Sequence, residues 1–271
     1  MISYLRKIIY KKNSEKEISI ANSIIHAIIN NTIDDTIIKM VNNIDFYYVT
    51  SEKKTILMFA CEYSKHEIVN ILLYNKYSDV GYCHHVFVHC TSFNHYYKHN
   101  TTALIYACEN YNNDVNMELA ILKLIETELT DLHISNWDNR TAIILACQKN
   151  ITNVVLKLIE INKSLAGDVD FFGYTPLIYA CINNNTKLAL KLIDTNQSNI
   201  NQDCRMNIHG KQKIYHNALI FALKNNMDTV ITKILNVDKN NEIKFKTIMF
   251  IKEYKLTDID NKLSTYSHQN F

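Results

Sequence analysis

Glycine and proline are scarce in this chain, which has four glycines and one proline among its 271 residues. The glycine-rich motifs that bind nucleotides, G-x-x-x-x-G-K-[ST] and G-x-G-x-x-G, do not occur in it. The serine-hydrolase motif G-x-S-x-G and the zinc-peptidase motif H-E-x-x-H are absent as well. These absences exclude the commonest signatures of enzymes, and we predict a protein without catalytic activity and without a cofactor.

An excess of charge of either sign is also lacking, since 29 basic side chains stand against 27 acidic ones and the formal net charge is +2. This balance gives no electrostatic reason to expect a nucleic acid or a membrane surface as partner. No uncharged apolar run approaches the roughly 18 residues that cross a bilayer. The first residues, MISYLRKIIYKKNSEKE, have no continuous apolar stretch of the kind found in signal peptides. We therefore expect a soluble protein of the cytoplasm.

What the chain has instead is a repeated phrase. It reads TILMFAC at 55–61, TALIYAC at 102–108, TAIILAC at 141–147, TPLIYAC at 175–181 and, in a degenerate copy, NALIFAL at 217–223. A further copy, NSIIHAI at 22–28, begins 33 residues before the phrase at 55. Self-similarity of this period indicates a stacked repeat protein, in which no single repeat is large enough to hold a core alone.

Each repeat is predicted to hold two short amphipathic helices. The phrase opens with threonine or asparagine, whose side chains cap the free N–H groups of a first turn. In the segment that follows, such as VVLKLIE at 154–160, apolar residues recur at three- and four-residue spacing. Between the two segments lies Asn150, Asn184 or Asn226, and asparagine enters the left-handed region readily. We expect a turn at each of these residues, and at Ser64 in the repeat at 55.

Four of the seven cysteines close the repeated phrase at one equivalent position. They are Cys61, Cys108, Cys147 and Cys181. Equivalent positions of packed helices lie about 8–10 Å apart, whereas a disulfide needs Cα atoms within about 7 Å. We therefore interpret these cysteines as small buried apolar residues in a reducing compartment.

The period near 33, the T-P-L-x-x-A phrase and the loop between repeats resemble the ankyrin repeat. The best match is DFFGYTPLIYAC at 170–181, which is similar to the family's D-x-x-G-x-T-P-L-H-x-A-A. NWDNRTAIILAC at 136–147 follows the same pattern, with Asn139 in the glycine place. The family's histidine is replaced by Ile144 or Ile178, which removes a familiar hydrogen bond but keeps the burial pattern. The resemblance implies an all-α solenoid of stacked helix-turn-helix units with loop or hairpin fingers.

The array is predicted to span residues 22–236, in repeats near 22–54, 55–101, 102–140, 141–174, 175–216 and 217–246. Residues 1–21 and 237–271 would cover its ends, because a solenoid needs capping for solubility. IKFKTIMFIKEYKL at 243–256 is the candidate for the first helix of a truncated final repeat. The repeat at 102 has five extra residues, which we place in the polar stretch ENYNNDVN at 109–116.

Ankyrin-repeat proteins recognise other proteins through the fingers and the ends of the first helices, on the concave side of the stack. The resemblance therefore implies contacts with a partner protein at Trp137, Asp138, Arg140, Gln148, Lys149, Phe171, Phe172, Tyr174, Ile182, Asn183, Lys98 and His99. The residues Trp137, Phe171, Phe172 and Tyr174 would place four aromatic rings on two adjacent fingers, as is typical of a binding hot spot. The alternative is that one or two of these rings pack under the next finger as core.

The segment GYCHHVFVHCTSFNHYYKHN at 81–100 concentrates histidine and cysteine. His95 and His99 have the H-x3-H spacing of a zinc finger, but six residues separate Cys83 from Cys90, where a finger has two to four. Alternation around VFVH also suits a short hairpin. The alternatives are bound zinc, a loop that contacts a partner and a plain surface insertion, and we predict no metal site.

We hypothesise a monomeric, non-catalytic interaction module that binds one partner protein through fingers 98–101, 136–140 and 170–174. The alternative is a substrate adaptor for a ubiquitin ligase or similar machinery. An adaptor needs a separate effector segment, and neither 1–21 nor 237–271 shows a convincing one. Abundant isoleucine, asparagine, lysine and tyrosine favour an AT-rich coding sequence, as in some large DNA viruses and protists.

Overall fold

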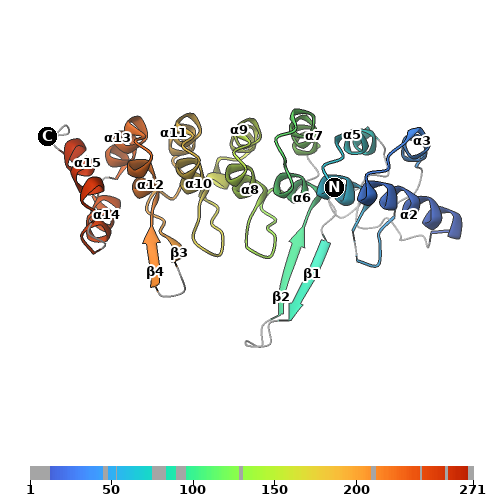
Figure 1. Cartoon of the computed structure of the whole chain (residues 1–271), viewed down its shortest axis with the longest axis horizontal. Helices are drawn as coiled ribbons and strands as arrows, with labels where there is room; N and C mark the ends of the chain where they lie inside the picture. The colour runs from blue at the N-terminus through green and yellow to red at the C-terminus, as the bar shows by residue number, and fades with distance from the viewer. Residues whose placement is uncertain are drawn as a thin grey trace. The chain divides into compact units, whose positions relative to one another are not determined.

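The computed structural model describes residues 13–44, 48–52, 54–74, 84–89, 96–127, 131–208, 212–238, 240–253 and 256–267. The chain forms two compact units. The N-terminal unit comprises Met1–His85 and Thr102–Thr130, and the C-terminal unit comprises Val86–Thr101 and Asp131–Phe271. Within each unit, consecutive helices form antiparallel pairs that stack side by side (Figure 1).

The described part of the N-terminal unit contains three helix pairs. They are α2 (Glu15–Asn30) with α3 (Asp35–Asn42), α4 (Ile56–Glu62) with α5 (His66–Tyr74), and α6 (Ala103–Glu109) with α7 (Val115–Glu126). First helices pack on first helices, α2 on α4 and α4 on α6, while second helices pack α3 on α5 and α5 on α7. The unit therefore has two helical layers.

The C-terminal unit repeats this arrangement. Its helices are α8 (Ala142–Gln148), α9 (Thr152–Ile161), α10 (Pro176–Ile182), α11 (Thr186–Asp194), α12 (Ala218–Lys224), α13 (Asp228–Val237), α14 (Glu242–Glu253) and α15 (Thr257–Ser267), with a short 3-10 helix η1 (Lys163–Gly167) after α9. The first helices α8, α10 and α12 form one layer, and α9, α11 and α13 form the other (Figure 1).

Two hairpins lie in the longer connections between pairs. β1 (His84–His89) pairs with β2 (Tyr96–Thr101), as the alternation around VFVH predicts. β3 (Cys204–Ile208) pairs antiparallel with β4 (Gln212–His216), and Cys204 lies opposite His216. From the sequence we expect only an insertion at 195–216, although Cys204, Met206 and Ile208 of β3 alternate with Arg205 and Asn207.

Side-chain caps begin most of the first helices, as predicted. Thr55, Thr102 and Thr175 each accept a hydrogen bond from the backbone N–H three residues later. Asn217 does the same for α12. Thr141 differs, because its hydroxyl donates to Asp168 Oδ2 at 2.7 Å and makes no cap bond. At α8 a link to the following loop replaces the cap.

The predicted turns between paired helices are confirmed. Asn150, Asn184 and Asn226 have φ of 58°, 53° and 54°, and Ser64 has φ of 52°. Each residue lies in the left-handed region, which lets the chain reverse directly after a first helix. In the longer repeat at 102, Asn113 takes this role with φ of 67°.

The five extra residues of the repeat at 102 do not all lie in the loop. α7 has 12 residues, whereas α5 has 9. Asp114 accepts a hydrogen bond from the backbone N–H of Asn116 and caps α7, so the helix begins inside the polar stretch at 109–116. The insertion therefore lengthens a helix as well as a turn.

The helix α2 begins earlier than the repeat pattern indicates. Ser14 and Glu17 form a reciprocal capping box, in which Ser14 Oγ accepts from the Glu17 N–H and Glu17 accepts from the Ser14 N–H at 2.6 Å. Asn22, which the pattern aligns with the capping threonines, lies inside the helix. Helix α2 thus runs across the expected boundary at residue 22.

The repeated phrase forms the core of both units. Cys61, Cys108, Cys147 and Cys181 are buried free thiols, as predicted, and Cys204 is buried as well. Burial raises the pKa of Cys61, and it raises the pKa of Cys108 and Cys181 to about 12. The recurrent cysteine is therefore a packing residue, since a thiol that stays protonated is a poor nucleophile.

We expect these thiols to be unreactive until the protein unfolds. In a Cys83→Ser/Cys90→Ser variant, a thiol reagent at neutral pH should label no cysteine in the native protein and five after denaturation. The thiols of the unfolded chain have a pKa of about 8.5. Above that pH the unfolded state therefore binds fewer protons than the folded state. The free energy of unfolding should then fall toward pH 12, by up to about 1.4 kcal/mol per pH unit for each of Cys61, Cys108, Cys181 and Cys204, whose pKa values burial raises. Labelling of the native protein would contradict the burial.

The last two helices pack against the final full pair. α14 covers most of the predicted segment 243–256, and both α14 and α15 contact α12. Buried Asn217 Nδ2 donates to the buried Thr247 Oγ1 at 3.1 Å. We propose that α14 and α15 are the C-terminal cap, because they cover the side of α12 that would otherwise be exposed.

Candidate functional site

The site begins with two tight fingers in the C-terminal unit, the tryptophan finger (136–140) and the phenylalanine finger (170–174). In the tryptophan finger, Asn136 Oδ1 accepts from the backbone N–H groups two and four residues later, at 3.1 Å each. In the phenylalanine finger, Asp170 Oδ1 makes the same two bonds at 2.9 and 2.8 Å. One side-chain oxygen therefore closes each finger.

Backbone bonds tie neighbouring fingers together. The Phe171 N–H donates to the carbonyl of Asp138 at 3.0 Å, and the Arg205 N–H donates to the carbonyl of Phe172 at 2.7 Å. The amide of Asn139 also donates to the carbonyl of Val169 at 2.7 Å. Bonded in this way, the finger tips are held at a fixed spacing by the scaffold.

Charged side chains brace the finger bases. Arg140 Nη1 lies 3.3 Å from Asp138 Oδ2, and Arg140 Nε lies 3.5 Å from Oδ2 of the buried Asp170. Tyr179 of α10 donates its hydroxyl to Asp170 Oδ2 at 3.1 Å. The ring of Tyr174 stacks on that of Tyr179, with 5.1 Å between centroids, and burial raises the pKa of Tyr174 to about 12. This network joins the phenylalanine finger to the first-helix layer.

Three of the four predicted aromatic side chains are exposed at the tips. Trp137 is 61% exposed, Phe171 is 55% exposed and Phe172 is 44% exposed. Tyr174 instead is half-buried and stacks on Tyr179 of α10, the first helix that directly follows this finger. Exposed tryptophan and phenylalanine on adjacent, mutually bonded fingers are typical of a surface that is covered by a partner.

The ends of the first helices supply the second part of the predicted site. Lys149 and Ile182 are exposed, and Gln148 is half-buried. The Asn183 amide donates to the carbonyl of Cys147 at 2.8 Å, and the Asn225 amide repeats this bond to Cys181 at 2.7 Å. Asn183 therefore links neighbouring first helices. Asparagine as the second residue after the phrase, at both 183 and 225, is the sequence signal for these bonds.

Lys98 and His99 lie on strand β2. Their side chains lie outside the described part of the structure. The same holds for the cysteine–histidine cluster between Cys83 and His99, whose possible zinc site lies outside the described side chains. Among the side chains that the structure does describe, no group of three or more His, Cys, Asp or Glu is placed to hold a metal ion. None of the described helices is long and apolar enough to cross a membrane.

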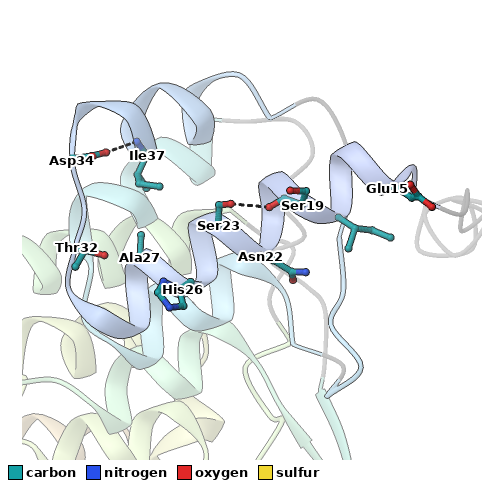
Figure 2. Close-up of a pocket in the computed structure, with 10 residues that line it drawn as sticks. Glu15, Ser19, Asn22, Ser23, His26, Ala27, Thr32, Asp34 and Ile37 are labelled. Atoms are coloured by element: carbon teal, nitrogen blue, oxygen red, sulfur yellow. Dashed lines mark hydrogen bonds between the residues drawn. The ribbon is translucent and has the colours of Figure 1, made fainter.

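The N-terminal unit has an open groove of about 830 Å³ between α2 and α3 (Figure 2). Polar residues among those that line it are Ser19, Asn22, Ser23, His26 and Asp34. Several of these groups serve the helices themselves, because Asp34 accepts from the Ile37 N–H and Ser23 donates to the carbonyl of Ser19. Asp34 and Ser23 therefore bond the backbone of the first helix pair.

A family model for ankyrin repeats, in three copies, matches residues 115–204. No match was found among curated proteins. One similar solved structure is the predatory endopeptidase Bd0816 from Bdellovibrio bacteriovorus in complex with the immunity protein Bd3460, with a TM-score of 0.53 and 18% identity over 83% of this chain and 99% of that one. Another is EF0377, an ankyrin repeat protein, with a TM-score of 0.54 and 17% identity over 80% of this chain and 97% of that one. The chain therefore has the ankyrin-repeat fold.

Proposed function

We propose that this protein is a non-catalytic interaction module, which binds a partner protein through fingers 98–101, 136–140 and 170–174 and the ends of its first helices. Ankyrin repeats are in general protein-interaction modules. The observation that carries the proposal is the exposure of Trp137, Phe171 and Phe172 on two fingers bonded to each other. Because the fingers are already ordered, binding loses little conformational entropy.

The predicted site residues divide into two roles under this proposal. The exposed side chains of Trp137, Phe171, Phe172, Lys149 and Ile182 make the contacts, together with Gln148 and, from strand β2, Lys98 and His99. The bonded side chains of Asp138, Arg140, Tyr174 and Asn183 hold those contacts in place. A truncation in the first group should weaken binding at unchanged stability, whereas a truncation in the second should lower both.

Affinity purification from the native cell, followed by mass spectrometry, identifies the partner. With that partner, Trp137→Ala/Phe172→Ala should weaken binding about a hundredfold, because central aromatic side chains dominate interface energies. Isothermal titration gives the affinity, and the thermal melt should be unchanged. Tyr74→Ala, which removes an exposed aromatic ring from α5 in the N-terminal unit, is the matched control. Unchanged affinity in the folded double variant would refute the site.

A second candidate is the adaptor, which delivers a bound target to a ubiquitin ligase or similar machinery. The observation that favours it is an exposed apolar pair on α14, Phe245 and Met249, one helical turn apart. Phe245→Ser/Met249→Ser should then release a second set of proteins from the purified complex and keep the finger-bound partner. If the variant keeps every protein of the purified complex, the adaptor function is refuted and the module only binds its partner.

We further propose that the module works as a monomer in the cytoplasm, without a cofactor and without nucleic acid. The near-zero net charge and the buried free cysteines support this proposal. The composition supports a source with an AT-rich genome, as in some large DNA viruses and protists. Light scattering of the purified protein tests the oligomeric state.

A further inference from the structure

The last residues of the first helices differ in charge between the two units. In the N-terminal unit α4 and α6 both end in glutamate, at Glu62 and Glu109. In the C-terminal unit the equivalent residues are Gln148, Ile182 and Lys224, none of them acidic. The helix ends of the C-terminal unit are therefore neutral or cationic.

These helix ends meet the bases of the fingers. Lys224 Nζ lies 3.1 Å from Nε2 of His216, the last residue of β4, and 5.7 Å from the centroid of the Phe221 ring. Tyr179, one turn before Ile182, stacks on Tyr174 of the phenylalanine finger. Helix ends and fingers therefore form one continuous surface within the C-terminal unit.

Cations on this surface have no carboxylate of their own. Within the described part of the chain, no acidic side chain lies within ion-pair distance of Lys149, Arg205 or Lys224, all three of which are exposed. The carboxylates nearby are already engaged, because Asp138 and Asp170 pair with Arg140. Burial of its stem beside Phe221 also lowers the pKa of Lys224, as is expected for a cation without a balancing charge.

Cations and apolar side chains come from neighbouring segments of the same surface. Arg205 of β3 lies beside the phenylalanine finger, because its backbone N–H donates to the carbonyl of the exposed Phe172. Lys149 directly follows α8, and Ile182 is the last residue of the neighbouring first helix α10. A ligand that is complementary to this surface must therefore carry both negative charges and apolar groups.

We propose that the partner presents to the C-terminal unit an acidic peptide segment that carries bulky apolar residues. This inference rests on the proposed function and names the chemistry of the partner. Carboxylates of the segment would pair with Lys149, Arg205 and Lys224, and its apolar side chains would pack on Trp137, Phe172 and Ile182. A protein segment is favoured over a single-stranded nucleic acid because the net charge of the chain is only +2.

The test uses the full chain and a library of random peptides displayed on phage. Selected peptides should contain Asp or Glu next to Trp, Phe or Leu. Lys149→Glu/Lys224→Glu should lower the affinity for a synthetic copy of a selected peptide roughly tenfold, and this loss should be smaller at high salt. Lys187→Glu/Lys191→Glu on α11 makes the same change in net charge on the second-helix layer and should leave affinity unchanged. Lys149→Gln/Lys224→Gln, which removes the charges without reversing them, replaces the first variant if that variant fails to fold.

Selection of peptides without acidic residues, or equal affinity of the two double variants, would overturn the inference. Salt-sensitive binding of a single-stranded oligonucleotide in competition with the peptide would overturn it in favour of a nucleic acid. Loss of the native partner in Trp137→Ala/Phe172→Ala but not in Lys149→Glu/Lys224→Glu would leave the proposed function standing and refute only the acidic segment. Retention of the partner by both variants would refute both.

Discussion

Replacing Asp170 with alanine should lower the free energy of unfolding by about 4 kcal/mol. The Asp170 carboxylate is buried, and it accepts from two backbone N–H groups of its own finger and from the hydroxyl of Tyr179. It also lies 3.5 Å from Arg140. Alanine would leave these donors, which are buried or partly buried, without their acceptor, and the phenylalanine finger would lose its closure. Urea denaturation followed by circular dichroism measures the change.

The chain itself offers the matched control for this variant. Asn136 closes the tryptophan finger with the same pair of backbone bonds, although it has no charge. Asp170→Asn should therefore keep the two turn bonds, but it should lose the ion pair with Arg140 and the acceptor for the Tyr179 hydroxyl, because an amide nitrogen replaces Oδ2. We expect a cost of about 2 kcal/mol. An alanine variant as stable as the asparagine variant would show that the turn bonds contribute nothing.

Replacing Gly173 with alanine should cost about 3 kcal/mol. Gly173 has φ of +85°, and a Cβ at this position would lie 2.3 Å from the carbonyl oxygen of Asp203. The atom in the way belongs to the backbone, so it cannot rotate aside as a side chain would. Thermal and urea denaturation report the loss, and binding of the partner should fall with it because Phe172 is the preceding residue.

Two variants separate the causes of that loss. Gly173→Asn introduces a residue that tolerates positive φ but keeps the Cβ, so it should be nearly as unstable as Gly173→Ala if the close approach to Asp203 is the cause. Asn139 occupies the equivalent position of the tryptophan finger at φ of 58°. Asn139→Ala tests the conformational cost there, together with the bond to Val169, and should cost about 1 kcal/mol. A stable Gly173→Asn would assign the effect to backbone conformation alone.

Local chemistry explains why much of the fold was predictable. Thr55, Thr102 and Thr175 cap helices, and Asn150, Asn184 and Asn226 reverse the chain, because each needs only its own neighbours to do so. The burial of the repeated cysteine follows from the same periodicity. These features act within a few residues, so a repeated pattern is enough to predict them.

Other features depend on which residues meet across the fold. The bond from Thr141 to Asp168 spans 27 residues and replaces a local cap. The amide of Asn183 reaches the carbonyl of Cys147, 36 residues earlier. A pattern that predicts the type of each element cannot choose between these partners, because the choice depends on distances between neighbouring repeats.

By itself, then, the sequence determined the helix pairs, their turns, the buried phrase and the two fingers that carry aromatic side chains. Tertiary structure alone decided that Trp137, Phe171 and Phe172 are exposed while Tyr174 packs on Tyr179. It also decided that Asp138 and Asp170 pair with Arg140, whereas no acidic side chain in the described part of the chain pairs with Lys149, Arg205 or Lys224. The physical reason is that exposure and charge balance are properties of neighbouring surfaces, and those surfaces exist only once the repeats have stacked.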